Sequence, residues 1–325
     1  MKTLSRTIGI PRLALSLVRC MSRPFTSFLM LFVLVIATAG VAQGQVIYDS
    51  TVSPLPGNLP SVGAEAYAFN ELGDGVNFAG TSRKLSSVTV TLSSWGCQSG
   101  HWYSGDCVTT PGATFTIPIT FNIYNAGNPL AGSSITTRTQ TFSVPYRPSA
   151  DTTNCTDGRW FDVVHATCFN GLATNVTFNF PTLPVLPNSV VYGSVYDTTS
   201  YGPIPIGQFA SCFTSSAGCP YDSLNIALAP VVTVGSKSFP GTLYQNTVYS
   251  SNYCDGGTAG TGTFRLDSPT SACWAGYIPA IQVNAANPPV TKDDCKKGSW
   301  ESLTNASGLP FPNQGQCIQY VNTGK

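Results

Sequence analysis

Residues 114–124 read TFTIPITFNIY and alternate strictly between polar and apolar side chains. The apolar members of this stretch are Phe115, Ile117, Ile119, Phe121 and Ile123. Successive side chains of a β-strand point to opposite faces of the sheet, so the alternation predicts a strand with one buried and one hydrated face. Pro118 falls on the hydrated side and predicts an edge strand or a bulge, because proline cannot donate a hydrogen bond to a neighbouring strand.

The same period of two recurs over much of the chain between residues 45 and 286. Residues 86–94, SSVTVTLSS, are a second clear case, and turn-forming clusters such as NAGNPLAG at 125–132 separate such stretches. The 31 glycines and 24 prolines also favour frequent turns. No helical periodicity of ten or more residues occurs between Gln45 and Asn284. The pattern predicts an all-β chain folded as an antiparallel two-sheet sandwich of the jelly-roll kind.

The character of the sequence changes at residues 287–289, where an Asn-Pro-Pro connector begins the last segment. Thr291 can cap a short helix that runs through CKKGSWESL at 295–303. Asn313 can cap a second helix, QGQCIQYV, at 314–321. Helices this short are marginal alone in water, so a disulfide between their cysteines is expected to hold them as a helical hairpin.

The start of the chain is expected to be a targeting segment. Residues 28–42, FLMLFVLVIATAGVA, carry no charge, but they are fewer than the roughly 20 residues that a membrane-spanning helix needs. Basic residues precede this run and small residues follow it, which is typical of an export signal. A signal peptide would occupy residues 1–44, with Met21 as an alternative start and an uncleaved anchor as the alternative fate. The chain is therefore expected to be secreted or held at the cell surface, with membrane contact only through this segment.

These patterns predict three parts: the signal peptide at 1–44, a β-sandwich domain at 45–286, and a linker with the hairpin tail at 287–325. Only 10% of the residues are charged, compared with about 25% in an average soluble protein. Five of the 16 basic residues precede the first acid, Asp49, so 11 basic residues face 15 acids in the remainder, a formal charge of −4. A surface of this kind cannot neutralise many phosphates, and nucleic acid is excluded as an expected partner.

The cysteines indicate disulfides rather than a metal site. Once Cys20 in the targeting segment is set aside, ten remain, and an even number in an exported chain is typical of a disulfide framework. No C-x-x-C motif supplies the close ligand spacing of a zinc site. Cysteines close in sequence are expected to bond, which gives the pairs Cys97–Cys107, Cys155–Cys168, Cys212–Cys219, Cys254–Cys273 and Cys295–Cys317.

Two stretches of the tail, KDDCKKGSW at 292–300 and NQGQC at 313–317, resemble a module at the C-termini of uncharacterised exported bacterial proteins. In the preceding domain, VTVTLSSWGC at 88–97 and YRPSAD at 146–151 resemble the secreted β-sandwich that is often joined to that module. The resemblance covers most of residues 46–325. It implies an exported β-sandwich protein, and it carries over no activity and no residue role.

Each of the five tryptophans lies within five residues of a cysteine. One interpretation is that each indole packs over a disulfide. The functional alternatives are contact with another protein, or stacking of the loop aromatics on sugar rings, for which an aromatic face offers a large contact area. The residues that would carry such binding are Trp95, Trp102, Tyr103 and Trp160.

Catalytic and metal-binding motifs are weak in this sequence. His101 and His165 lie inside separate predicted disulfide loops, and a shared site would require them to meet Asp106 or Asp162. The metalloprotease motif H-E-x-x-H and the hydrolase motif G-x-S-x-G are both absent from the sequence. No residue can be assigned a catalytic role on this basis.

Two functions are compatible with these patterns. The leading expectation is an exported protein without a catalytic site that binds a glycan or a cell-surface protein, or that has a structural role. The alternative is a secreted polysaccharide hydrolase or lyase that uses a pair of carboxylates, which such enzymes assemble in space rather than in sequence. Candidates for the pair are Glu65, Glu71, Asp74, Asp106, Asp162 and Asp222. No cofactor is expected. A structural calcium ion could bind near residues 71–75 or 255–257, although neither stretch has the ligand spacing of an EF-hand.

Overall fold

The computed structural model describes residues 45–64, 69–100, 102, 105–127, 131–196, 224–239, 244–247, 263–266, 276–305 and 309–324. The predicted targeting segment and the predicted pairs Cys212–Cys219 and Cys254–Cys273 lie outside these residues and stay predictions. Among the described residues, no helix is both long enough and apolar enough to cross a bilayer.

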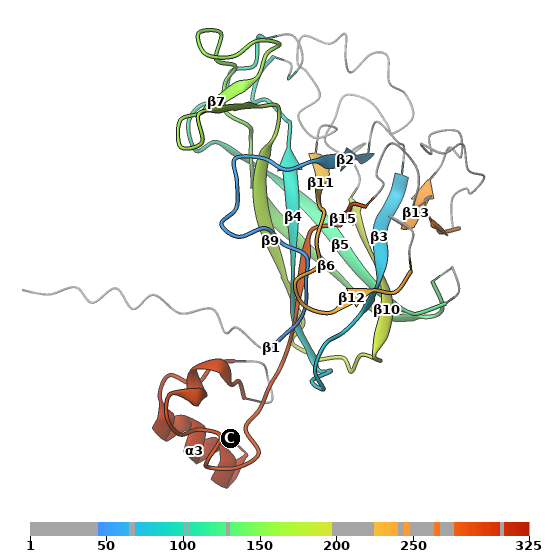
Figure 1. The fold of residues 1–325 in the computed structure, drawn as a ribbon, viewed down its shortest axis with the longest axis vertical. Coiled ribbons are helices and arrows are strands. Elements are labelled where there is room, and N and C mark those ends of the chain that lie inside the picture. The colour runs from blue at the N-terminus through green and yellow to red at the C-terminus, as the bar shows by residue number, and fades with distance from the viewer. Residues whose placement is uncertain are drawn as a thin grey trace, which may run out of the picture. The chain divides into compact units, whose positions relative to one another are not determined.

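The described chain forms two seven-stranded sheets, and every strand pair is antiparallel (Figure 1). Sheet A contains, in spatial order, β1 (Gln45–Asp49), β16 (Ile281–Ala285), β4 (Leu85–Ser94), β11 (Leu224–Ala229) and β15 (Ile278–Pro279), with β2 (Ser61–Gly63) on β11 and β9 (Leu172–Asn179) on β4. Sheet B contains β14 (Arg265–Leu266), β13 (Tyr244–Thr247), β3 (Phe69–Asn77), β10 (Ser189–Tyr196), β5 (Thr114–Asn125) and β6 (Ser134–Pro145), with β12 (Ser236–Lys237) on β3. A separate hairpin pairs β7 (Trp160–Asp162) with β8 (Thr167–Phe169).

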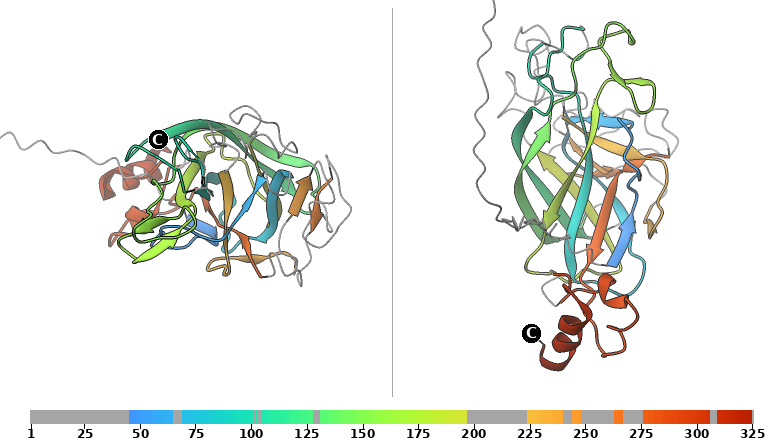
Figure 2. Two further views of the ribbon diagram at one scale, coloured as in Figure 1. Left: turned by 90° about the horizontal axis from the view of Figure 1, so that it is seen from above. Right: turned by 90° about the vertical axis from the view of Figure 1, so that its left-hand side faces the viewer.

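The core lies between the sheets and is built from the alternating residues. All five apolar side chains of β5 between Phe115 and Ile123 are buried, as the sequence predicts. Phe121 of β5 stacks on Tyr192 of β10 at 5.5 Å between ring centroids, and it meets Phe178 of β9, in the other sheet, at the same distance. The end-on view in Figure 2 shows strands of both sheets around this core.

The predicted two-sheet sandwich is confirmed, and the chain crosses repeatedly between the two sheets. The chain passes from one sheet to the other between β3 and β4, between β4 and β5, and between β9 and β10. Gln140 also joins the sheets along one side, because its side-chain oxygen accepts from the backbone N–H of Asn179 in β9 at 2.7 Å. The side chain of Gln140 in sheet B thus satisfies a backbone N–H on β9, a strand at the edge of sheet A.

Pro118 does not lie on an edge strand, because β5 pairs with β6 on one side and with β10 on the other. The pairing of β5 with β10 runs only from Asn125 to Ile119, whose partner is Tyr196, the last residue of β10. Among the described residues, Pro118 therefore lies one residue past the end of the β5–β10 pairing and opposite Thr141 of β6.

The tail contains one of the two predicted helices. Helix α3 (Gln314–Thr323) begins as predicted, with the side chain of Asn313 accepting from the backbone N–H of Gln316 at 2.9 Å. The other predicted helix, at 295–303, is wrong in extent. Its segment forms turns and then the single 3-10 turn η3 (Ser299–Ser302). Positive φ values of 56° at Lys297 and 83° at Gly298 break the helical path. Thr291 nevertheless caps this segment as predicted, because its hydroxyl accepts from the backbone N–H of Asp294 at 3.3 Å.

The tail has its own small core, closed by the predicted Cys295–Cys317 disulfide. The two cysteines pack with Leu303 and Phe311, and Trp300 lies against this cluster.

We expect Cys295→Ser with Cys317→Ser to destabilise the tail by about 3 kcal/mol, because the bridge restricts a loop of about 22 residues in the unfolded chain. Hydrogen exchange measured by mass spectrometry should show lost protection in α3 and unchanged protection in β4 and β5. Unchanged exchange in α3 would contradict this role.

Candidate functional site

Two disulfide-closed loops extend beyond the strands of the sandwich (Figure 1). The Cys97–Cys107 bond closes the loop after β4, and the Cys155–Cys168 bond closes the loop that carries the β7–β8 hairpin. We call residues 97–107 and 155–168 the stapled loops. Both bonds match the predicted pairing, with Cα–Cα distances of 5.5 and 5.8 Å. Three disulfides among the described residues indicate that the chain matures in an oxidising environment.

Arg147 joins the two stapled loops. Its side chain is fully buried, and its guanidinium donates to the carbonyl of Trp102 in one loop at 3.1 Å and to that of Gly158 in the other at 2.6 Å. The Nε–H donates to the carbonyl of Pro148 at 3.2 Å. A planar guanidinium offers five donors in a fixed fork, which suits three separate carbonyls. Burial lowers the pKa of Arg147 to about 10, so the group stays charged at neutral pH.

Trp95 and Trp102 contact each other edge to face, with ring centroids 4.7 Å apart. The indole N–H of Trp95 donates to the hydroxyl of Ser93 at 2.9 Å. Gly171 lies against the same indole so closely that a Cβ at this position would collide with the ring. Both indoles are half-buried, and part of each is occupied by protein. Packing accounts for these two tryptophans without a ligand.

Trp160 is only 7% exposed. Its indole N–H donates to the carbonyl of Gly171 at 2.7 Å, and its ring lies 5.6 Å from that of Phe169. A buried ring with its polar atom already bonded supports the hairpin and offers no face to a sugar. Tyr103, the fourth residue of the predicted aromatic set, and His101 lie outside the described residues.

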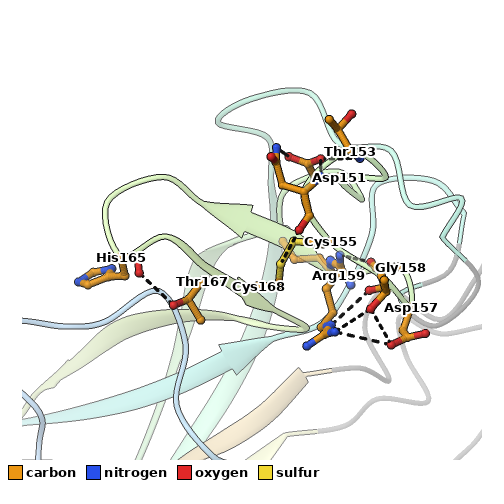
Figure 3. The surroundings of a disulfide bond; sticks show 12 residues. Asp151, Thr153, Cys155, Asp157, Gly158, Arg159, His165, Thr167 and Cys168 are labelled. Carbon is orange, nitrogen blue, oxygen red and sulfur yellow. Dashed lines mark hydrogen bonds and ion pairs between the residues drawn. A yellow bond between two sulfur atoms is a disulfide. The ribbon is translucent and has the colours of Figure 1, made fainter.

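Asp162 and His165 meet within the β7–β8 hairpin, with Oδ2 and Nδ1 2.5 Å apart. This contact lowers the pKa of Asp162, chiefly through the hydrogen bond from His165. In Figure 3, His165 points away from the Cys155–Cys168 bond. The pairing of His165 with Asp162 was one requirement for the shared histidine site. In the part of the chain that the structure describes, no three His, Cys, Asp or Glu residues are grouped closely enough to hold a metal ion.

Glu71 and Asp74 are both buried but point to opposite faces of β3, because residues three apart on a strand do so. Glu71 lies on the outer face of sheet B, where its carboxylate accepts from Asn122 at 2.9 Å and from the Tyr124 hydroxyl at 3.0 Å. Asp74 lies inside the sandwich, directly across from Tyr192. Burial raises the pKa of both carboxyls. These two candidates cannot act on one substrate, and two others, Glu65 and Asp222, lie outside the described residues.

A groove of about 720 Å³ lies beside the stapled loops, and we call it the proline groove. It is lined by Thr109, Pro111, Gly112, Ala113, Pro145, Tyr146, Pro148, Ser149, Ala150, Asp151, Thr152, Thr153 and Leu172. The ring of Tyr146 packs on Phe115 of the core at 4.9 Å. Tyr146 therefore gives the groove an apolar surface that is anchored to the sandwich.

Asp151 is the single charged residue among those that line the proline groove. Its carboxylate accepts from the backbone N–H groups of Thr153 and Asn154 and from the Asn154 side chain, each at 2.9 Å (Figure 3). These bonds, with the Asn154 side chain first, lower the pKa of Asp151 and keep it ionised at neutral pH. Sequence reasoning did not identify the groove, because its walls come from the 109–113 loop, the 145–153 segment and β9, and none of them has a period or motif that marks a site.

A scan against protein-family models finds no matching family, and searches of curated proteins and of solved structures find no match.

Proposed function

We propose that this chain is an exported binding protein without a catalytic site, and that it holds a segment of another exported or cell-surface protein in the proline groove. The observation that carries the proposal is the groove itself. Its volume of about 720 Å³ falls in the range of roughly 300–1,000 Å³ that is typical of ligand sites.

The chemistry of the lining favours a particular kind of segment. Three prolines, Tyr146 and Leu172 present apolar surface, and proline has no N–H to donate to a ligand. The ionised carboxylate of Asp151 is the one charge in the lining. This combination is complementary to an extended peptide that has apolar side chains and a lysine or arginine.

The supports of the groove favour tight binding. The Cys97–Cys107 and Cys155–Cys168 disulfides, with Arg147 between the loops, restrict the segments that flank the groove before any ligand arrives. A site that is already ordered loses less conformational entropy on binding.

Two observations weigh against the other functions considered. The tryptophans that could stack on sugar rings are packed against protein, Trp160 most completely. The carboxyls of Glu71 and Asp74, which a hydrolase could use, lie on opposite faces of one strand.

A peptide-display selection on the oxidised protein tests the proposal. We expect enriched peptides to combine apolar residues with a basic residue. Leu172→Lys should weaken their binding at least tenfold, because it places in the groove a positive charge that repels the basic residue of the peptide and competes with it for Asp151. Val185→Lys is the matched control, since Val185 is 67% exposed and does not line the groove. Peptides that bind both variants equally, or groove-dependent binding of glycans in place of peptides, would contradict the proposal.

A further inference from the structure

Uncharged polar side chains cover the outer face of sheet A where β9, β4 and β16 run side by side. Thr177, Thr89 and Gln282 form one cross-strand row, because Thr89 pairs with both of the others. Ser87 and Asn284 pair in the neighbouring row. This face is the floor of a second groove, of about 390 Å³, which we call the amide groove. It is lined by Thr51, Val52, Ser53, Leu55, Ser87, Thr89, Asn175, Thr177, Gln282 and Asn284.

The wall of the amide groove is the segment that follows β1. Ser50 ties this segment to sheet A, since its hydroxyl donates to the carbonyl of Pro279 at 2.9 Å and its backbone N–H donates to that of Ile281 at 2.8 Å. Val52 packs against a cluster of alanines from β11 and the neighbouring Ala280. Val52 and Leu55 therefore give the groove an apolar side next to its polar floor.

Asn284 carries an unused hydrogen-bond acceptor. The residue is only 5% exposed, and among the described residues its side-chain oxygen has no hydrogen-bond partner. Its orientation is set by a chain of bonds: the amide N–H of Asn284 donates to Gln282 at 3.3 Å, and that of Gln282 donates to Asp49 at 2.8 Å. Leaving a buried acceptor unpaired costs about 1–3 kcal/mol, so a donor is expected to fill this position.

The threonine pair on the floor of the groove offers a hydrogen-bond donor, whereas Asn284 offers an acceptor. The hydroxyls of Thr89 and Thr177 are 2.9 Å apart and share one hydrogen bond. One of the two donates in that bond, so the other keeps its proton for a further acceptor. The groove thus combines a free acceptor with an available donor, and no charged side chain lines it.

We propose that the amide groove binds a neutral saccharide. A sugar hydroxyl both donates and accepts, so one ring can satisfy Asn284 and the threonine pair together, while its C–H face lies against Val52 and Leu55. The lack of a charge in the lining favours neutral over anionic sugars, because a carboxylate or sulfate would lose water without gaining an ionic partner. The proposal does not depend on the proline groove.

Saturation-transfer NMR with neutral gluco-, galacto- and N-acetylglucosamine oligosaccharides tests the proposal. The variant is Thr89→Val with Thr177→Val, which removes both hydroxyls and keeps the branched shape that suits a strand. We expect it to weaken saccharide binding by about tenfold, the effect of one or two lost hydrogen bonds. The matched control is Thr120→Val with Thr139→Val, which removes the same kind of cross-strand pair, 2.7 Å apart, between β5 and β6. The control pair should bind as the wild type does.

Three outcomes would overturn the proposal: no neutral saccharide gives a signal at up to about 10 mM, both double variants lose binding equally, or uronic acid and sulfated oligosaccharides bind better than neutral ones. Leu172→Lys should leave saccharide binding unchanged, so that failure at the amide groove is distinguishable from failure at the proline groove.

Discussion

Arg147→Met will lower the free energy of unfolding by about 4 kcal/mol, because it leaves the carbonyls of Pro148, Trp102 and Gly158 without their donor. Methionine fills much of the same space, so the loss reports the hydrogen bonds more than a cavity. Urea unfolding of the oxidised protein measures the change. Arg147→Lys should recover only part of it, since one ammonium group cannot reach carbonyls on both stapled loops.

Arg159→Met is the matched control for this experiment. Arg159 lies in the 155–168 stapled loop, is partly exposed and pairs with Asp157 at 3.6 Å (Figure 3). Surface ion pairs of this kind contribute at most about 1 kcal/mol. If Arg147→Met destabilises no more than this control does, Arg147 does not hold the loops together. If Arg147 does hold the loops together, Arg147→Met should also weaken peptide binding in the proline groove, because two walls of the groove adjoin the stapled loops.

Asp74→Asn will stabilise the protein above about pH 4 by an amount that grows with pH. Asp74 is fully buried, and among the described residues its Oδ2 atom has no hydrogen-bond partner. Burial raises its pKa well above the usual range, and the charge of Lys237 offsets this only in part. The groups that face Asp74 are Tyr192 directly opposite, Tyr48 from β1 and the half-buried Lys237 on β12.

The sign of the effect comes from comparing the folded and unfolded states. Below the unfolded pKa of Asp74, both states carry the proton and its titration does not change the free energy of unfolding. As the pH rises, the unfolded chain releases the proton while the folded chain retains it, so stability falls by about 1.4 kcal/mol per pH unit until the folded pKa is reached. Asparagine has nearly the same shape and does not titrate, so the variant lacks this loss.

Thermal or urea unfolding of the wild type and Asp74→Asn at several pH values between 4 and 8 measures the difference. Asp151→Asn supplies a control of opposite sign when the series is extended below pH 4. Because the pKa of Asp151 is lowered, its contribution is constant above about pH 4 and is lost as the pH falls further. Parallel pH profiles for the wild type and Asp74→Asn would show that Asp74 does not retain its proton in the fold.

Local features of this chain could be read without the structure. The alternation in β5 identifies its buried residues, because the side chains of any strand alternate between faces. The Cys97–Cys107, Cys155–Cys168 and Cys295–Cys317 bonds join sequence neighbours, for which a short turn is enough to bring the sulfurs together. The Asn313 cap depends on residues three positions apart. In the tail, by contrast, the capping residues at 291–294 are present and the helix still fails, because the conformations of Lys297 and Gly298 interrupt it.

The sites depend on contacts that no local pattern contains. The Ser50 side chain meets Pro279 across 229 positions of sequence, and Arg147 reaches loops on both sides of itself. The sequence does not distinguish a tryptophan that packs inside the protein from one that binds a ligand. The low exposure of Trp160 in the structure shows that its ring is buried. The sequence by itself determined which residues of β5 face the core, how the cysteines of the three described disulfides pair and how α3 begins, because period and proximity along the chain control these. The tertiary structure alone decided where the two grooves lie and which buried polar atoms are left unpaired, because both depend on how distant strands align.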